Sequence, residues 1–301
     1  MKKNKLLIAA ILLLVSITTV YGQQDPQYTQ YMYNMNVLNP AYAGSRGVTS
    51  IALLGRSQWV GVDGAPQTAT LSVNSPLGKR AGFGFSVIHD EIGPAKENNV
   101  YIDFSYAIPT SEHGKLAFGV KGGATFLNVR EVITVDPDPL NTPIDLFAPN
   151  FGLGVMYYNQ KFYIGLSAPN ILETKYLEKE NGISSTASEK THYFFTSGYV
   201  FDIDNNLKLK PSTMVKASTG TPVSIDLSLN LLVQKRVEFG LSVRLDDSLN
   251  GIVGFQVNNN LKIGYAYEHT TSRFKVFNSG SHEIIFLFDI NKRKIKSPRF
   301  F

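Results

Sequence analysis

Histidine and cysteine are the side chains that most often carry acid–base or metal chemistry, and this chain uses them sparingly. It has no cysteine, and its five histidines are scattered, at His89, His113, His192, His269 and His282. A helical zinc site needs two histidines four residues apart, and a structural zinc site commonly uses cysteine ligands. The spacing therefore predicts no metal site and no cofactor.

The densest acid–base group is His89-Asp90-Glu91. General acid–base catalysis would need a second convergent group and a nucleophile, and proximity in sequence supplies neither. We interpret this group as the solvated edge of a loop, and predict no catalytic residues and no enzyme activity. His269 and His282 flank another predicted loop, where we expect them to face each other across a hairpin as a metal-free polar pair.

Two glycine pairs, Gly82-Phe83-Gly84 and Gly152-Leu153-Gly154, resemble fragments of nucleotide-binding loops. That chemistry requires a helix directly after the loop, and neither pair precedes a helical pattern. Both pairs lie inside alternating segments instead. A glycine on the inner face of a strand relieves crowding or allows another backbone to approach closely.

The elements that carry these residues are segments in which apolar residues alternate with polar or small ones. Within residues 237–245 the odd-numbered positions are apolar and the even-numbered positions are Glu, Gly, Ser and Arg. A period of two with one apolar face is typical of a strand between two environments. Fourteen such segments are predicted, at 48–59, 66–75, 81–91, 97–109, 114–130, 147–159, 161–171, 190–203, 207–218, 222–234, 236–246, 250–258, 260–271 and 281–291.

An even number of strands of about ten residues is typical of an antiparallel transmembrane β-barrel. The alternative all-β folds, a secreted sandwich or a propeller, would bury their apolar rows in a common core. Here the opposite rows mix small and charged residues, such as Gly119, Lys121 and Lys210, which would line a wet lumen. Candidate aromatic girdle residues are Tyr157, Tyr158, Phe162, Tyr163, Tyr265 and Tyr267.

The predicted connections fall into two groups by length. Every second one is a short turn rich in Asn and Asp, such as 159–160 and 258–259. The long ones include Glu131–Leu146, Leu172–Lys190 and Thr270–Gly280. Short periplasmic turns and long outer loops are the rule for outer-membrane barrels. The barrel is predicted to span residues 48–291.

Charge and hydropathy set the two ends of the chain apart. Residues 1–22 combine Lys2, Lys3 and Lys5 with the apolar run Leu6–Val15, the pattern of a secretory signal peptide. Residues 292–301 form a basic tail, expected at the periplasmic rim. The sequence pI near 9.1 arises from these ends and does not indicate nucleic-acid binding.

Residues 23–47 form an aromatic segment between the predicted signal peptide and the first strand. The segment shows no helical or strand period, so we predict an irregular structure packed against something. Asn39-Pro40 predicts a turn, because proline excludes the helical region for the preceding residue. The residues expected to form a plug or a partner contact are Tyr28, Gln30, Tyr31, Asn39, Pro40, Tyr42 and Gly44.

This segment also carries a family resemblance. Residues 24–32 (QDPQYTQYM) and 38–44 (LNPAYAG) resemble the N-terminal signature of the PorP/SprF family of the type IX secretion system. The resemblance implies an outer-membrane location and a barrel similar to long-chain fatty acid transporters, in which an N-terminal segment plugs the lumen. It also implies a role in delivering or retaining one adhesin-like exported protein, recognised through its C-terminal signal domain.

The expected partners are therefore outer-membrane lipid, that exported cargo protein and components of the periplasmic secretion machinery. The alternative function, favoured by barrel physics alone, is a channel for a small hydrophobic or polar solute. A solute-selective permeability of the intact protein would distinguish the channel from the secretion component.

Overall fold

A computed structural model describes residues 28–130, 143–172 and 190–290. The predicted signal peptide, the basic tail, and most of the predicted loops 131–146 and 172–190 lie outside these residues. No helix in the described part of the chain is long and apolar enough to cross a membrane.

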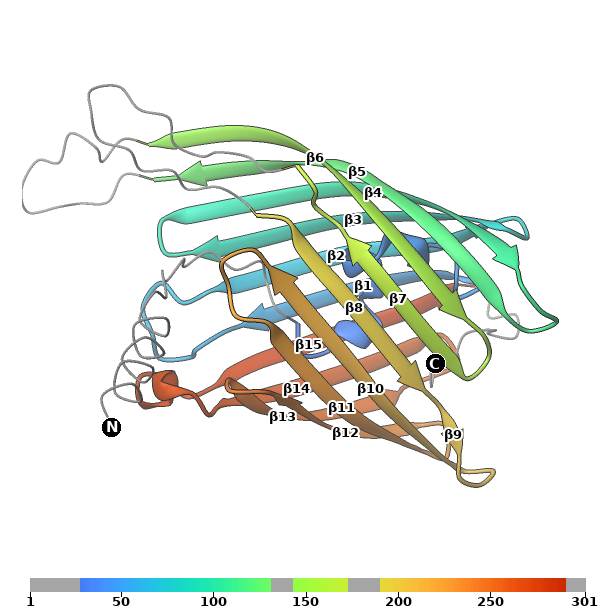
Figure 1. Ribbon diagram of the computed structural model, residues 1–301. Helices are drawn as coiled ribbons and strands as arrows, with labels where there is room; N and C mark the ends of the chain where they lie inside the picture. Colours follow the sequence, from blue (N-terminus) through green and yellow to red (C-terminus); the bar gives the residue numbers. More distant parts are fainter. Residues whose placement is uncertain (1–27, 131–142, 173–189, 291–301) are drawn as a thin grey trace, which may run out of the picture.

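The described chain forms one closed antiparallel barrel of fourteen strands, as the alternation predicted (Figure 1). Sequential strands pair with one another, and pairing of β1 with β15 closes the ring. The labels run to β15 because the short strand β9 directly follows β8 in the chain. Both β8 and β9 pair with β10, so together they occupy one position in the barrel wall. The strands are β1 (Thr49–Ser57), β2 (Gln67–Leu77), β3 (Ala81–Ile92), β4 (Ala95–Pro109), β5 (Lys115–Val129), β6 (Ile144–Tyr158), β7 (Phe162–Ala168), β8 (His192–Tyr199), β9 (Phe201–Asp202), β10 (Leu207–Ser218), β11 (Ser224–Val233), β12 (Val237–Arg244), β13 (Ser248–Gln256), β14 (Leu261–Thr270) and β15 (Ser281–Ile290).

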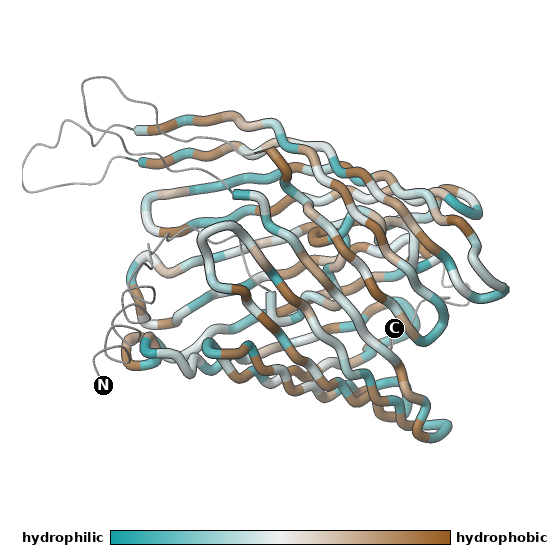
Figure 2. Tube along the Cα trace, in the orientation of Figure 1, coloured by the Kyte–Doolittle hydropathy of each residue, from teal (hydrophilic) through white to brown (hydrophobic). Residues whose placement is uncertain are grey.

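The two faces of the wall differ as the alternation predicted. In β12 the exposed side chains are Phe239, Leu241 and Val243, whereas Glu238 and Ser242 are buried on the inner face. Figure 2 shows the resulting alternation of hydrophobic and hydrophilic residues along the strands. Apolar side chains outside and polar ones inside are the arrangement that a barrel in lipid requires.

The prediction of an outer aromatic girdle is wrong for two residues. Tyr158 and Tyr163 are buried, with about 7% of each residue exposed. Their neighbours Tyr157 and Phe162 occupy the opposite face, because successive residues of a strand point to opposite sides. Tyr265 and Tyr267 are exposed on the outer face, as a girdle would require.

The barrel has two distinct ends. We name the end where β1 begins and β15 ends the turn end, and the opposite end the loop end. Tight turns close the turn end: Gln234 and Lys235 both have positive φ, as a two-residue hairpin turn requires. The loop end carries the longer connections 58–66 and 271–280, although β3 and β4 are joined there by Gly93 and Pro94 alone.

The N-terminal segment (residues 28–47) lies inside the barrel (Figure 1). As predicted, the segment is largely irregular, and it contains three short helical turns: η1 (Tyr31–Tyr33), α2 (Met35–Leu38) and η2 (Pro40–Tyr42). Asn39 is extended, as predicted before a proline, and its side chain accepts a hydrogen bond from the Ala41 N–H. These turns are too short to show a helical apolar period.

Candidate functional site

The predicted site residues all lie in the N-terminal segment, and the structure places them in the lumen. Every residue from Tyr28 to Ala43 is buried, and Gly44 is half-buried. Residues 45 and 46 are also buried, and the chain then enters β1. The site is therefore the contact between this segment and the inner wall, and its chemistry is that of the wall residues described next.

The first contact lies toward the loop end. The Glu283 carboxylate, in β15, accepts hydrogen bonds from the backbone N–H groups of Thr29 at 2.9 Å and Gln30 at 2.7 Å. Two successive amides that point at one carboxylate form charge-assisted hydrogen bonds, which are about twice as strong as neutral ones. Glu283 thereby holds the start of the described segment through the backbone N–H groups of that segment.

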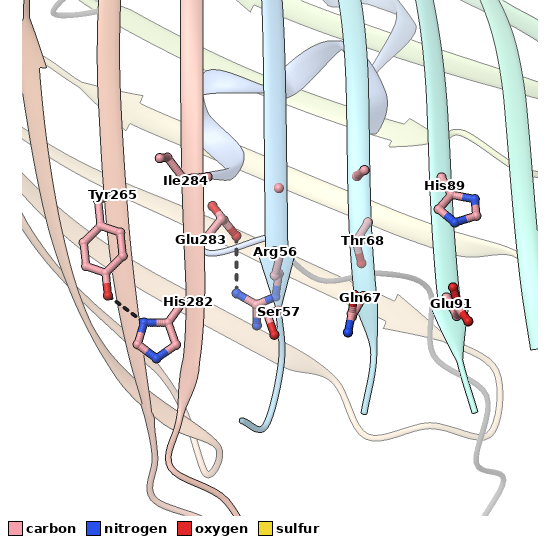
Figure 3. A pocket seen from close by; sticks show the side chains of 12 residues that line it. Arg56, Ser57, Gln67, Thr68, His89, Glu91, Tyr265, His282, Glu283 and Ile284 are labelled. Atoms are coloured by element: carbon pink, nitrogen blue, oxygen red, sulfur yellow. Dashed lines mark hydrogen bonds and ion pairs between the residues drawn. The ribbon is translucent and has the colours of Figure 1, made fainter. Parts of the chain in front are cut away.

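A buried charge network orients this carboxylate. Arg56 in β1 contacts Glu283 at 3.3 Å (Figure 3). It also contacts Glu268 of β14 at 3.0 Å. Arg56 also donates to the Thr29 hydroxyl, which in turn donates to Glu268. We name this set the charged anchor: Thr29, Gln30, Arg56, Glu268 and Glu283.

Arg244 extends the network around the wall. Its guanidinium makes a two-pronged contact with Asp226 of β11, at 2.8 and 3.2 Å, and reaches Glu268 at 3.3 Å. A planar guanidinium fits a carboxylate in this geometry, whereas a lysine would make only a point contact. Charges from five wall strands are thus tied into one buried unit beside Thr29.

Two lysines hold the middle of the segment. Lys262 pairs with Glu238 and donates to the Tyr33 hydroxyl at 3.0 Å. Across the lumen, Lys121 pairs with Asp103 at 3.2 Å and donates to the carbonyl groups of residues 36 and 37. The Asn36 amide donates to Asp103 at 3.0 Å.

Toward the turn end the segment approaches the wall through glycines. A Cβ on Gly82 would lie 2.1 Å from the Ala43 carbonyl oxygen, and one on Gly119 would lie 2.1 Å from the Ala41 nitrogen. One on Gly154 would lie 2.1 Å from the Asn39 side-chain oxygen. Real Cβ atoms do not come so close, so any other residue would displace the segment. We name these three residues the glycine seam.

Hydrogen bonds along the seam satisfy the backbone of the segment. Ser105 and Ser167 donate to the carbonyl groups of residues 43 and 38, at 2.6 and 2.7 Å. The Asn39 amide donates to the Val155 carbonyl at 3.2 Å. At the mouth, Arg46 forms a 2.7 Å ion pair with Asp289. Buried backbone groups need such partners, which explains the serines on the inner rows.

Burial also fixes the protonation of the segment itself. It raises the pKa values of Tyr31 and Tyr33 well above the ordinary tyrosine value, so both hydroxyl groups remain protonated. Burial lowers the pKa of Arg46, an effect that the neighbouring Asp289 carboxylate opposes. Among the described residues, the buried side chains comprise seven acids and seven Lys or Arg residues, so the filled lumen is close to neutral.

The histidines do not converge. His89 and Glu91 face outward while Asp90 faces inward and accepts from Thr68, because adjacent strand residues point in opposite directions. The expected pair of His269 and His282 is wrong: the hairpin register places His282 opposite Tyr267, and its Nδ1 contacts the Tyr265 hydroxyl. No cluster suited to a metal occurs among the residues that the structure describes.

Sequence reasoning did not single out the wall side of the site, namely Glu283, Glu268, Arg56 and Arg244. Their inward orientation follows from the strand alternation. Their pairing depends on which strands are neighbours and in which register, which the alternation does not specify. A search for charged residues on inner rows near the same strand ends could have found them.

A closed antiparallel barrel with an apolar exterior and an internal N-terminal segment defines an outer-membrane β-barrel protein with an occupied lumen. Residues 20–288 match the family described as type IX secretion system membrane protein PorP/SprF. The chain therefore belongs to that family, and its location is the outer membrane. No curated protein matches the chain.

Solved structures with the same kind of fold are distant in sequence. The "CymD monoaromatic hydrocarbon channel" is 12% identical with a TM-score of 0.52, covering 86% of this chain and 93% of that one. A Pseudomonas aeruginosa FadL homologue is 12% identical with a TM-score of 0.40, covering 80% and 88%. Omp33 of Acinetobacter baumannii is 10% identical with a TM-score of 0.43, covering 81% and 98%. The likeness to CymD supports the barrel fold alone.

Proposed function

We propose that this barrel serves the type IX secretion system as the outer-membrane partner of one exported surface protein. It would help to deliver or retain that protein at the cell surface by recognising its C-terminal signal domain. Contact with periplasmic secretion components is part of the same proposal. Because outer-membrane barrels keep short turns in the periplasm, the loop end would face the exterior.

The observation that carries the proposal is the occupied lumen. The Arg46–Asp289 ion pair and hydrogen bonds from wall strands converge on residues 29–46. Arg56, Lys121 and Lys262 on the inner wall also donate hydrogen bonds to that segment. A solute channel would instead offer free polar groups along an open path. We therefore propose that the N-terminal segment acts as a plug, and that partner contacts lie on the exposed loops.

Deletion of the whole protein tests this function. The expected result is that one exported protein disappears from the cell surface and accumulates in the cell or the medium, while other type IX cargo is still displayed. Surface proteomics of intact cells measures both. Normal display of every exported protein would contradict the proposal.

Liposome swelling tests the alternative solute channel. The intact purified barrel is expected to leave swelling rates in sugars and small aromatic solutes at the level of protein-free liposomes. Selective, saturable swelling would support the channel and contradict a permanent plug.

A further inference from the structure

The described loops at the loop end form an ordered surface. Residues 58–66 and 271–280 are joined by backbone hydrogen bonds, from the Val60 N–H to the Gly280 carbonyl at 2.9 Å and from the Ser279 N–H to the Val60 carbonyl at 2.8 Å. The Thr271 N–H donates to the Asp247 carbonyl in the neighbouring loop at 2.7 Å. These loops therefore hold a fixed shape without a partner.

This surface presents aromatic and aliphatic side chains. Trp59 packs edge-on against Phe274, with ring centroids 4.8 Å apart, and Phe274 lies 5.8 Å from Phe277. Phe277 is 67% exposed and Val276 is 73% exposed. We name Trp59, Phe274, Val276 and Phe277 the apolar platform. Large apolar groups that an ordered loop holds in the open mark interaction sites.

The backbone of Trp59 supports a functional role for the platform. Its φ is +44°, a conformation that is an outlier for a bulky residue. The Trp59 N–H donates to the Ser281 hydroxyl at 3.2 Å, which helps to hold this conformation. Such strain costs about 1–3 kcal/mol and is retained mainly at functional sites.

Two cations flank the platform. Arg273 and Lys275 lie in η3 (Arg273–Val276) and are exposed, and neither forms an ion pair with any residue that the structure describes. The loop 271–280 contains no acidic residue. Apolar side chains beside unpaired cations complement a surface that combines an apolar pocket with carboxylates.

On β1, β2 and β15 a polar rim lies between the platform and the lipid-facing belt. The outward side chains at the loop ends of β1, β2 and β15 are Ser57, Gln67 and His282, and they border a hollow of about 560 Å³ on the outer wall (Figure 3). The apolar belt begins beyond this rim, with Leu53 and Ile284. On these three strands the platform is therefore not continuous with the surface that contacts acyl chains, which favours a protein partner.

We propose that the apolar platform is the docking surface for the exported protein, through a region of that protein in which an apolar pocket is bordered by Asp and Glu. The proposal rests on the proposed function. Trp, Tyr and Arg are enriched among the few residues that carry most of the binding energy of a protein interface.

Site-specific photo-crosslinking in intact cells tests the proposal. A photoreactive phenylalanine analogue is placed at Phe277, and in a control at Leu241, whose exposed fraction of 66% on the lipid-facing wall is nearly equal. A cross-link to one exported protein is expected from position 277 and not from position 241. Cross-links from position 277 to lipid alone would overturn the proposal in favour of a membrane contact.

Two double variants complete the test: Val276→Ser with Phe277→Ser, and Arg273→Glu with Lys275→Glu. Heat-modifiable gel mobility verifies that each variant forms a barrel. The identified protein is expected to bind the purified variants roughly 30-fold more weakly or worse, as loss of an interface hot spot implies. Unchanged affinity would overturn the platform, even where deletion of the barrel abolishes display. Normal display after deletion would instead contradict the proposed function itself.

Discussion

The two ends of the N-terminal segment are held in different ways. Near the loop end, the charged anchor holds Thr29 and Gln30 with buried ion pairs and charge-assisted hydrogen bonds. Toward the turn end, the glycine seam holds residues 39–43 by close backbone approach, with uncharged hydrogen bonds from serines and an asparagine. The first depends on charge and the second on the absence of side-chain volume.

This difference implies two kinds of failure. Removal of a charge at the anchor takes one partner away from a charge that stays buried, which is costly in a low-dielectric interior. The contacts at the seam involve no charged group, but there is no space there for additional side-chain atoms. The anchor should therefore be sensitive to deletion of a side chain, and the seam should be sensitive to enlargement.

The largest effect is expected from Glu283→Ala. The substitution removes a buried ion pair with Arg56 and leaves two backbone N–H groups without an acceptor. The free energy of unfolding should fall by about 3–5 kcal/mol, measured by urea titration of the folded gel band. The matched control is Glu91→Ala, which removes the half-exposed pair with Lys96 and should not shift the urea midpoint. Equal shifts in the two variants would show that the anchor does not stabilise the barrel.

The next effect is expected from Gly119→Val at the seam. The new Cβ would meet the Ala41 nitrogen at 2.1 Å, so the segment must move or the wall must bend. Overpacking of this kind costs about 1–3 kcal/mol. Gly122→Val on the same strand is the control, because nothing lies within 4 Å of its Cβ position. If both variants unfold at the same urea concentration, the close approach of the segment at Gly119 is incorrect.

The strands and their inner and outer faces could be predicted from the sequence, whereas the contacts between the N-terminal segment and the wall could not. The alternation gave fourteen strands close to their observed bounds, because each residue of a strand has only two faces available. It also placed Gly82 and Gly119 on the inner face, where another backbone could approach. The contacts of Gly119 with Ala41 and of Glu283 with Thr29 could not be predicted, since they join residues that are distant in sequence and depend on barrel closure.

The smallest effect is expected from Asn39→Ala. The substitution removes the side-chain acceptor for the Ala41 N–H at the start of η2 and the donor to the Val155 carbonyl. Loss of such a cap costs about 0.5–2 kcal/mol, which urea titration can measure. The control is Asn98→Ala, whose exposed side chain forms a hydrogen bond with His89 and none with the N-terminal segment among the described residues. A larger loss for Asn39→Ala than for Glu283→Ala would reverse the comparison between the two ends.

Ionic conductance in planar bilayers tests the central proposal, a lumen closed by the N-terminal segment, most directly. Deletion of residues 24–35 removes the part held by the charged anchor and by Lys262, while every strand of the barrel remains. The intact protein is expected to conduct little, and the deletion variant, once shown by gel mobility to form a barrel, is expected to open stable ion-conducting pores. A folded deletion variant with unchanged conductance would contradict the plug.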